Sequence, residues 1–279
     1  MANIYNVNGN IIDICGDDGF VIHVGTGQEY STLRSGIAEA ILHKGATVIV
    51  HSGVYDLTSE FAAEISAASG SSQIGIELGN DVNVIFNSGA YVKALFPTSS
   101  TWIDTYFSPF YGKNFTLDGL NIEASNCRYC IHDEQNGENV QYHNTYKNCI
   151  MKMTADPSSG YTNGHPQCIG GGLGKYGVID IDGGSYYSEG TDLITGECPC
   201  ISYHNGSTAG CDSRIFIRDV YLDGDDGNLR FGYYGASTIQ TMVYVSGCSM
   251  GSAILKRAET SSSHNDNMTI TEWNNAIRA

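Results

Sequence analysis

His132 and Glu134 are the residues of this sequence whose type and spacing best suit acid–base chemistry. They lie two positions apart in the segment RYCIHDEQNGENV, which spans residues 128–140, directly after the apolar pair Cys130 and Ile131. A histidine titrates near neutral pH, and a neighbouring carboxylate can adjust it for proton transfer. The alternative for His132 is a structural histidine with satisfied hydrogen bonds.

Asp104 and Glu134 form a second candidate pair. On neighbouring parallel strands, about 4.8 Å apart, their carboxyl groups would lie roughly 5 to 7 Å from each other. That range includes carboxyl separations found in glycoside hydrolases, in which one carboxyl group protonates the leaving oxygen. Two solvated surface acids are the simpler interpretation in a chain of formal net charge −16.

A strand without side chains could let a ligand approach the backbone nearby. The segment QCIGGGL contains Gly170–Gly172, and the long segments TADPSSGYTNGHP and GTDLITGEC could form walls beside it. His204 and Arg230 could bind a carboxylate or stabilise an enolate-like charge. The alternative is that the glycines only make room for a bulky loop. The predicted ligand-binding residues are Gly170, Gly171, Gly172, Ser202, His204, Arg230, His165 and Tyr161, and the predicted catalytic residues are His132, Glu134 and Asp104.

The elements that would position these residues recur along the chain. Short alternating strands end seven times in a polar or small corner, and successive corners are 27 to 37 residues apart. The corners are His51-Ser52-Gly53, Asn87-Ser88-Gly89, Asp118-Gly119, Asn148-Cys149, Asp182-Gly183, Asp219 and Ser246-Gly247. Asn, Asp and Gly tolerate the left-handed backbone conformation of a sharp bend. A period of this length predicts a solenoid of stacked coils.

A second element follows each corner, and one apolar residue in each copy is expected to point into the coil. These residues are Ile76, Ile103, Ile131, Ile169, Ile201, Leu229 and Ile254. Since side chains alternate along a strand, the next residues point outward, and they are Glu77, Asp104, His132, Gly170, Ser202, Arg230 and Leu255. Two positions further come Gly79, Tyr106, Glu134, Gly172, His204, Gly232 and Arg257. Asp133 and Lys256 are expected to belong to the following turns.

The sequence therefore predicts an all-β, right-handed parallel β-helix solenoid. A β-sandwich would need turns about every 8 to 12 residues, whereas three short strands per coil of roughly 30 residues suit a solenoid. The segment STLRSGIAEAILHKG predicts a capping helix over about residues 31–44, with Ser31 as N-cap and Gly45 as its end. The expected apolar face of this helix contains Ile37, Ala38, Ile41 and Leu42. Residues 1–24 are predicted to form a hairpin or arm that turns at Asn8-Gly9, and residues 25–279 the β-helix domain.

Composition narrows the classes of partner. The net charge of −16 over 279 residues argues against nucleic acid. The sequence has no run of about 18 apolar residues, so no membrane span is expected. The N-terminus MANIYNVNGN lacks the basic and apolar regions of a signal peptide. Cytoplasmic synthesis is therefore expected, with virion association or non-classical export as further routes.

Cysteine and aspartate clusters give no firm metal site. The nine cysteines are irregularly spaced and are expected to be mostly reduced and buried, rather than zinc ligands or disulfides. The segment LDGDDGN, with Asp223, Asp225 and Asp226, has the look of a calcium loop but lacks its later glutamate. A solvated turn is the better interpretation, and no metal or cofactor is predicted.

The segment VGTGQEYSTLRSGIAEA, followed by GATVIVHSGVYDL, resembles the N-terminal pattern of the pectin-lyase-like superfamily. The corners resemble the asparagine-type ladder of pectate lyases, and the YCIHDE series falls where their catalytic sheet lies. The resemblance covers nearly the whole chain and implies a right-handed β-helix. It specifies activity poorly, because this fold is found in lyases, hydrolases, esterases and non-catalytic spikes. The segment MANIYNVNGNIIDI also resembles N-termini of tail proteins from phages and prophages of Gram-positive bacteria.

The motifs of individual activities in this superfamily are mostly missing. In polygalacturonases a Gly-His-Gly motif follows an Asp-Asp motif and precedes Arg-Ile-Lys. Here His165 precedes Asp225 and Asp226, and no Arg-Ile-Lys follows. Neither the paired aspartates of pectin methylesterases nor the calcium-binding aspartates of pectate lyases are evident.

Two functions from different classes follow. One is a carbohydrate-active enzyme, a glycoside hydrolase or polysaccharide lyase, that binds and cleaves a polysaccharide in a groove along one sheet of the β-helix. The other is a non-catalytic, glycan-binding or structural protein of the tail-spike type, which would be a homotrimer. Both predict a polysaccharide or surface glycan as the partner, and neither predicts nucleic acid or a membrane.

Overall fold

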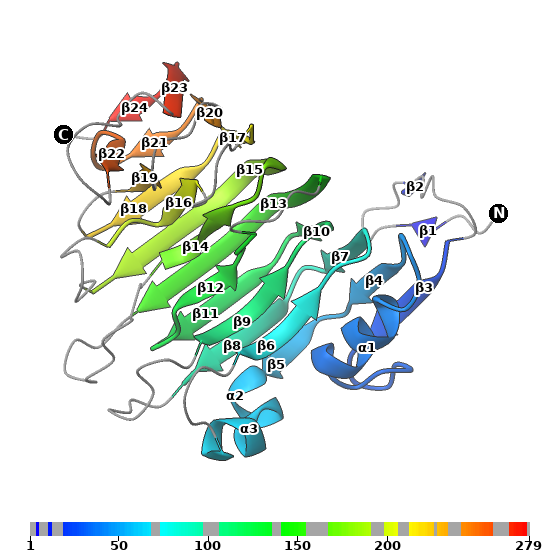
Figure 1. The fold of residues 1–279 in the computed structure, drawn as a ribbon. Helices are drawn as coiled ribbons and strands as arrows, with labels where there is room; N and C mark the ends of the chain where they lie inside the picture. The colour runs from blue at the N-terminus through cyan, green and yellow to red at the C-terminus, as the bar shows by residue number, and fades with distance from the viewer. Residues whose placement is uncertain are drawn as a thin grey trace.

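Two large sheets, each built only of parallel strands, make up most of this computed structural model (Figure 1). The residues that the structure describes are 4–5, 11–12, 19–67, 73–96, 106–135, 141–154, 167–190, 198–205, 212–225, 228–233, 241–258 and 268–277. The chain is thus a mainly β protein, and long all-parallel sheets of this kind are compatible with a parallel β-helix solenoid.

The larger sheet has two rows of strands. The first row contains β3 (Val21–Val24), β4 (Thr47–Val50), β7 (Val82–Phe86), β10 (Phe115–Asp118), the first halves of β13 (Gln141–Thr154) and β15 (Tyr176–Glu189), β17 (Arg214–Arg218), β20 (Thr241–Ser246) and β23 (Met268–Trp273). The second row contains β5 (Gly53–Asp56), β8 (Ala90–Leu95), β11 (Asn121–Ser125), the second halves of β13 and β15, β18 (Tyr221–Gly224), β21 (Ser249–Met250) and β24 (Ala276–Ile277). The long strands β13 and β15 pass through both rows and join them into one sheet.

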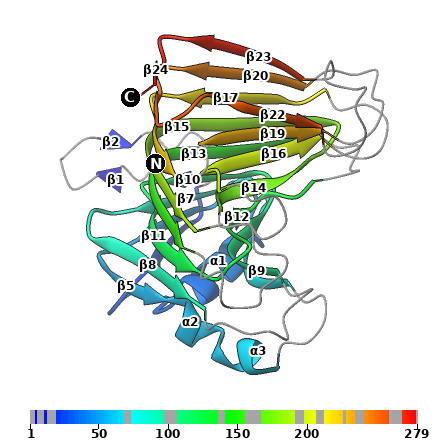
Figure 2. The ribbon, with the colours of Figure 1, turned by 90° about the vertical axis from the view of Figure 1, so that its left-hand side faces the viewer.

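The smaller sheet forms a third row. It contains β6 (Gln73–Leu78), β9 (Tyr106–Gly112), β12 (Tyr129–His132), β14 (Gln167–Leu173), β16 (Ile201–Asn205), β19 (Leu229–Tyr233) and β22 (Leu255–Ala258). Figure 2 shows the strands of successive coils stacked in layers toward β23 and β24. Each coil therefore brings residues about 30 positions apart in sequence onto neighbouring strands.

Residues in the left-handed backbone conformation form the predicted corners between the first and second rows. Six predicted corners contain a residue with φ between 51° and 84°, and Asn274 adds another with φ 54°. The six are Gly89, Gly119, Asn148, Gly183, Asp219 and Gly247. At Gly119 a Cβ atom would also lie only 2.9 Å from the carbonyl oxygen of Phe86 on the preceding coil. The turn therefore demands both the conformation and the small size of glycine there.

The predicted inward column is confirmed at most positions and wrong at one. Pairing aligns Ile76, Phe110, Ile131, Ile169, Ile201 and Leu229, and the described side chains of this column are buried. Phe110 holds the place predicted for Ile103, which lies outside the described residues. The strand of this coil is YFSPFYG rather than the upstream segment TWIDTYF, and it pairs with β6 through an irregularity between Ile74 and Ile76.

Asp133 points into the core instead of belonging to the following turn. Its backbone N–H donates to Gly170 at 2.9 Å, so the ladder to β14 continues past the end of β12. Its carboxylate is 1% exposed and accepts hydrogen bonds from Asn144 Nδ2 at 2.7 Å, from the Tyr146 hydroxyl at 3.0 Å and from the Tyr203 hydroxyl at 2.9 Å. Burial raises the pKa of Asp133 to about 6, although these three donors act in the opposite direction.

The capping helix is shorter than predicted. The helix α1 spans Leu33–Ala40, and its N-cap is Thr32 rather than Ser31, because the Thr32 hydroxyl accepts the Ser35 N–H at 3.2 Å. Its buried face consists of Leu33, Gly36, Ile37 and Ala40. Ala38 and Leu42 are exposed instead, since the helix ends before Leu42. The helix contacts β3, β4 and β6, as expected for an end cap.

Other elements complete the described chain. Two short helices that the sequence did not predict, α2 (Leu57–Glu60) and α3 (Ala62–Ala67), follow β5. Strand β1 (Ile4–Tyr5) pairs antiparallel with β2 (Ile11–Ile12), whereas β3, within the first 24 residues, pairs in parallel with β4. No helix in the described ranges is long and apolar enough to cross a membrane.

The described cysteines agree with the predicted reduced state. Each is buried and forms no disulfide with another described cysteine, and they are Cys127, Cys130, Cys149, Cys168, Cys198, Cys200 and Cys248. Cys15 and Cys211 lie outside the described residues. The thiols therefore act as small apolar groups between the sheets.

Candidate functional site

The outer face of the third row brings His132, Glu134 and His204 together. The carboxylate oxygen Oε2 of Glu134 lies 3.8 Å from His132 Nε2 and 3.6 Å from His204 Nε2. The same oxygen accepts a hydrogen bond from the Gly172 N–H at 2.9 Å. One carboxylate is thus held between two imidazoles by a backbone donor, and we refer to these three side chains as the histidine–glutamate cluster.

Strand register explains why these residues meet. Gly170 pairs with both His132 and Ser202, and Gly172 pairs with His204, so the predicted outward columns hold on β12, β14 and β16. Glu134 extends the column of Gly172, because the N–H of Gln135 donates to the Gly172 carbonyl at 2.6 Å. Three strands that are remote in sequence therefore supply one cluster.

Burial and hydrogen bonding set the charges of the cluster. The side chains of His132 and His204 are 9% and 15% exposed, and that of Glu134 is 32% exposed. Burial lowers the pKa of His132, which favours its neutral form at neutral pH. Burial alone would raise the pKa of Glu134, but the two imidazoles, which lie within ion-pair distance, outweigh it in their protonated forms and hold that pKa below its usual range. At neutral pH the cluster then contains an ionised Glu134 beside a neutral His132.

The tautomer of His132 follows from its other neighbour. Its Nδ1 lies 3.3 Å from the Gln73 side-chain oxygen, an acceptor, so Nδ1 is placed to donate the proton. Nε2, the nitrogen that faces Glu134, is then unprotonated. A proton taken up at Nε2 would create a cation beside a carboxylate, which stabilises it.

The predicted bare groove floor is corrected by Tyr129. A Cβ atom on Gly170 would lie 2.1 Å from the Tyr129 ring, so that ring fills the outward side of this glycine. Tyr129 also stacks on His132 with ring centroids 5.1 Å apart. Gly171 points inward, where a Cβ would lie 2.0 Å from the Asp133 carbonyl oxygen. The glycines therefore make room for Tyr129, Asp133 and Glu134.

A pocket of about 440 Å³ adjoins Glu134 on the side of β6 and β9. Its lining includes Glu77, Lys113 and Gln135, together with the backbone around Gly79 and Gly112. Its size is within the usual range of small-ligand sites, about 300–1,000 Å³. Among the described residues, this open space lies on the side of the cluster that faces the N-terminal strands.

Ser202 and Arg230 are buried beside the cluster. Each is only 5% exposed, and Arg230 Nε donates to the Ser202 hydroxyl at 3.1 Å. The predicted anion clamp at Arg230 is therefore a buried, hydrogen-bonded guanidinium. Lys113, which lines the pocket, is the cationic side chain that the prediction missed.

Three predicted site residues, Asp104, Tyr161 and His165, lie outside the described residues. Tyr111 takes the column position predicted for Asp104, because it pairs with both Glu77 and His132. The predicted carboxyl pair on adjacent strands is corrected accordingly. Gln73 and Tyr129 were not predicted as site residues. Alternation from Ile131 predicts that Tyr129 points inward, whereas its ring lies over Gly170.

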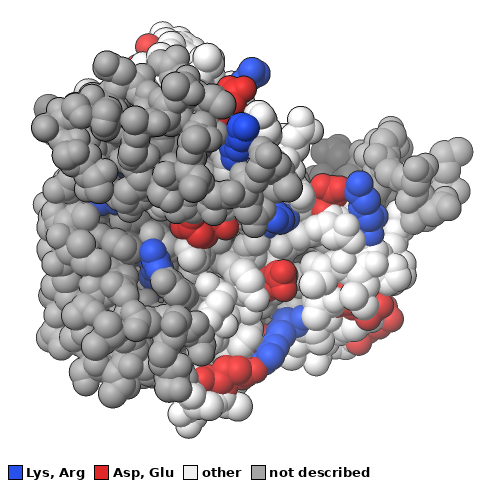
Figure 3. All heavy atoms as spheres, in the orientation of Figure 1, with Lys and Arg blue, Asp and Glu red and all other residues white. Residues whose placement is uncertain are grey.

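Charge over the visible surface is mixed. On the face drawn in Figure 3, acidic and basic side chains of the described residues are interspersed. Among the described residues, no group of three or more His, Cys, Asp or Glu side chains is placed to hold a metal ion. Comparisons with protein-family models, with curated proteins and with solved structures find no match to this chain.

Proposed function

We propose that this chain is a carbohydrate-active enzyme with a right-handed parallel β-helix of the pectin-lyase-like type, which cleaves a polysaccharide at the histidine–glutamate cluster. The observation that carries this proposal is the position of the Glu134 oxygen between two imidazole nitrogens, beside a pocket of about 440 Å³. Three rows of parallel strands, left-handed corners and an end helix support the fold assignment.

Elimination from a uronate-containing polysaccharide suits these groups best. Hydrolysis normally uses two carboxyl groups on either side of the bond, and Glu77 and Glu134 both line the pocket. The two imidazoles beside Glu134, however, supply the base and the acid that elimination needs. In elimination, the Glu134 side chain turns toward the pocket and exposes the otherwise buried His132 Nε2, which removes the proton from the carbon next to the uronate carboxylate. The electron pair of that C–H bond forms a carbon–carbon double bond, and the bond to the leaving glycosidic oxygen breaks.

The remaining groups have matching roles. Glu134 stabilises the imidazolium that forms on His132. The protonated imidazole of His204 donates its proton to the leaving oxygen. Lys113 in the adjoining pocket can pair with the substrate carboxylate, which lowers the barrier to removing the neighbouring proton. Each step uses a side chain at the cluster or in its pocket.

One observation also favours a second candidate, a glycan-binding protein of the tail-spike type without catalysis. Glu134 Oε2 already accepts the Gly172 N–H, so the carboxylate also fixes the strand end locally. A purely structural carboxylate would have the same contact. Activity measurements separate the two functions.

The test is a panel of uronate-containing and neutral polysaccharides, followed by unsaturated-uronate absorbance and by release of reducing ends. We expect absorbance with at least one uronate polymer, and a loss of roughly a hundredfold or more in rate for His132→Ala and Glu134→Gln. Gln at position 134 keeps an acceptor for the Gly172 N–H, so the fold should survive. The matched control is His43→Ala, which removes a histidine–glutamate contact on the capping side. Full activity in both cluster variants would refute the proposal.

A further inference from the structure

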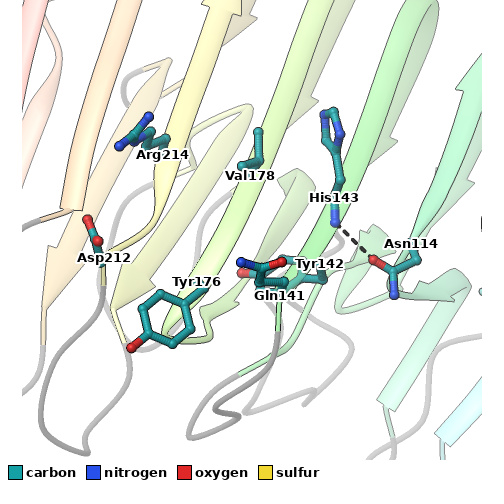
Figure 4. Close-up of a pocket in the computed structure, with 8 residues that line it drawn as sticks. All are labelled: Asn114, Gln141, Tyr142, His143, Tyr176, Val178, Asp212 and Arg214. Atoms are coloured by element: carbon teal, nitrogen blue, oxygen red, sulfur yellow. Dashed lines mark hydrogen bonds between the residues drawn. The ribbon is translucent and has the colours of Figure 1, made fainter.

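A second pocket, of about 470 Å³, lies on the outer face of the first row (Figure 4). It is lined near the starts of consecutive strands β10, β13, β15 and β17, on a different sheet from the histidine–glutamate cluster. Its lining includes Gln141, His143, Tyr176, Val178, Asp212 and Arg214. This pocket has no part in the function proposed above.

Strand register places polar side chains on both sides of the pocket and the apolar Val178 at its floor. Val178 pairs with both His143 and Arg214, so the two polar side chains are on the strands flanking Val178, about 10 Å apart at their Cα atoms. Figure 4 shows Val178 between them, with Tyr176 and Gln141 at the lower edge. Tyr176 is 39% exposed, so part of its ring is open to a ligand.

The wall beside His143 is fixed by hydrogen bonds that lead to the core. The Asn114 side-chain oxygen accepts the His143 backbone N–H at 2.9 Å, and the Asn114 N–H donates to Asn144 at 2.7 Å. Asn144 in turn donates to the buried Asp133. A site whose walls are held in this way loses little conformational entropy when a ligand binds.

Cationic groups lie on the Arg214 side of the pocket and next to Tyr176. Arg214 forms no ion pair with another described residue, unlike Arg218 on the same strand and face, which pairs with Asp180 at 2.7 Å. The Lys175 ammonium lies 5.2 Å from the centre of the Tyr176 ring. Arginine binds carboxylates through two parallel hydrogen bonds, and the face of a tyrosine ring packs against apolar faces such as those of sugars.

We propose that this pocket binds a carboxylate-bearing sugar unit, with its carboxylate on Arg214, its ring on Tyr176 and Val178, and its hydroxyl groups on Gln141, His143 and Asp212. Amide, imidazole and carboxylate groups supply both donors and acceptors, as the hydroxyl groups of a sugar require. The inference stands apart from catalysis, since it uses no residue of the histidine–glutamate cluster. An anionic polysaccharide could bind here even if the chain cleaves nothing.

The test is ligand-observed NMR titration of the full chain with galacturonate and glucuronate, and with galactose and glucose as uncharged counterparts. We expect saturable binding of at least one uronate, and binding of its neutral counterpart at least about tenfold weaker, because a hydrogen-bonded charge is lost. Arg214→Gln and Tyr176→Ala should each weaken uronate binding by about tenfold or more. The matched control is Arg218→Gln, which removes an already paired arginine from the same strand and should leave uronate binding unchanged.

A double variant, His132→Ala with Glu134→Gln, locates the binding. Uronate affinity should be unchanged in it, since neither His132 nor Glu134 lines this pocket. Absence of saturable uronate binding, equal binding of neutral sugars, or wild-type affinity in Arg214→Gln would each overturn the proposal. Affinity lost in the double variant and kept in Arg214→Gln would assign the uronate to the histidine–glutamate cluster instead.

Discussion

Replacement of the buried Asp133 by asparagine should remove a pH-dependent loss of stability. The folded protein holds this carboxyl group with a pKa raised from 3.8 to about 6 by burial. Between these two values the folded state binds more protons at Asp133 than the unfolded state does. Stability from this site is therefore fully present below about pH 4 and decreases as the pH rises toward about 6.

The magnitude follows from the size of the shift. Two pKa units correspond to about 3 kcal/mol of unfolding free energy, which wild type lacks above pH 6. Asparagine is close in shape, and its amide oxygen can still accept the hydrogen bond from Asn144. Its new N–H groups face the hydroxyl oxygens of Tyr146 and Tyr203, which can act as acceptors. Asp133→Asn should therefore fold, and gain stability relative to wild type as the pH rises.

The assay is urea unfolding of wild type and Asp133→Asn at pH 4, 5, 6 and 7. The difference in unfolding free energy between the two proteins should change by about 3 kcal/mol in favour of the variant across this range. The control is Asp223→Asn, a replacement at an exposed acid, which should shift stability by less than about 1 kcal/mol at each pH. A difference that stays constant with pH would refute the assignment of a raised pKa to Asp133.

Three further expectations concern the cluster, the glycine strand and the thiols. Because burial lowers the pKa of His132, the cleavage rate of wild type should stay high on acidification to the usual histidine range and fall only below it. An acidic loss of rate that begins above the usual histidine range would contradict a buried base. Gly171→Ala should lower the thermal midpoint strongly, since its Cβ would lie 2.0 Å from the Asp133 carbonyl, whereas Gly79→Ala, with 3.5 Å to its nearest neighbour, should be mild. Thiol titration of the unfolded chain without reductant should find close to nine free cysteines, and a count of three or fewer would show that disulfides form.

Local patterns explain how much of the architecture was predictable. A left-handed corner must be formed by residues such as Asn148, Asp219 or Gly247, and these stand at regular intervals in the sequence. Alternation then identifies which residues of a strand point inward, as at Ile131, Ile169 and Ile201. Both signals depend on a residue and its immediate neighbours, so the sequence alone carries them.

The misplaced strand shows where such patterns fail. Both TWIDTYF and YFSPFYG alternate, and either could supply an apolar residue next to Ile131. The choice of Phe110 depends on the length of the preceding loop and on the irregularity at Ile74 and Ile76. Neither is encoded in alternation. The predicted placement of Asp104 on the strand next to Glu134 depended on this register, and Tyr111 holds that position instead.

Contacts between coils decide the details of the site. Gly170 is small because Tyr129, on the preceding coil, needs the space beside it. The sequence could show that a side chain was missing at Gly170, and it could not show what filled the gap. An open groove and a filled one give the same run of three glycines, so this alternative needed the structure.

Asp133 links the core to both candidate sites. A charged residue at an inward position is normally excluded, but Asn144, Tyr146 and Tyr203 converge on it from β13 and β16. Its immediate neighbour Glu134 faces outward into the histidine–glutamate cluster, while Asn144 continues to the wall of the second pocket through Asn114. The hydrogen bonds of this one buried carboxyl group therefore fix the strand end that carries Glu134, together with the loop beside His143. Such an anchor accounts for an acid in the interior of a mainly apolar core.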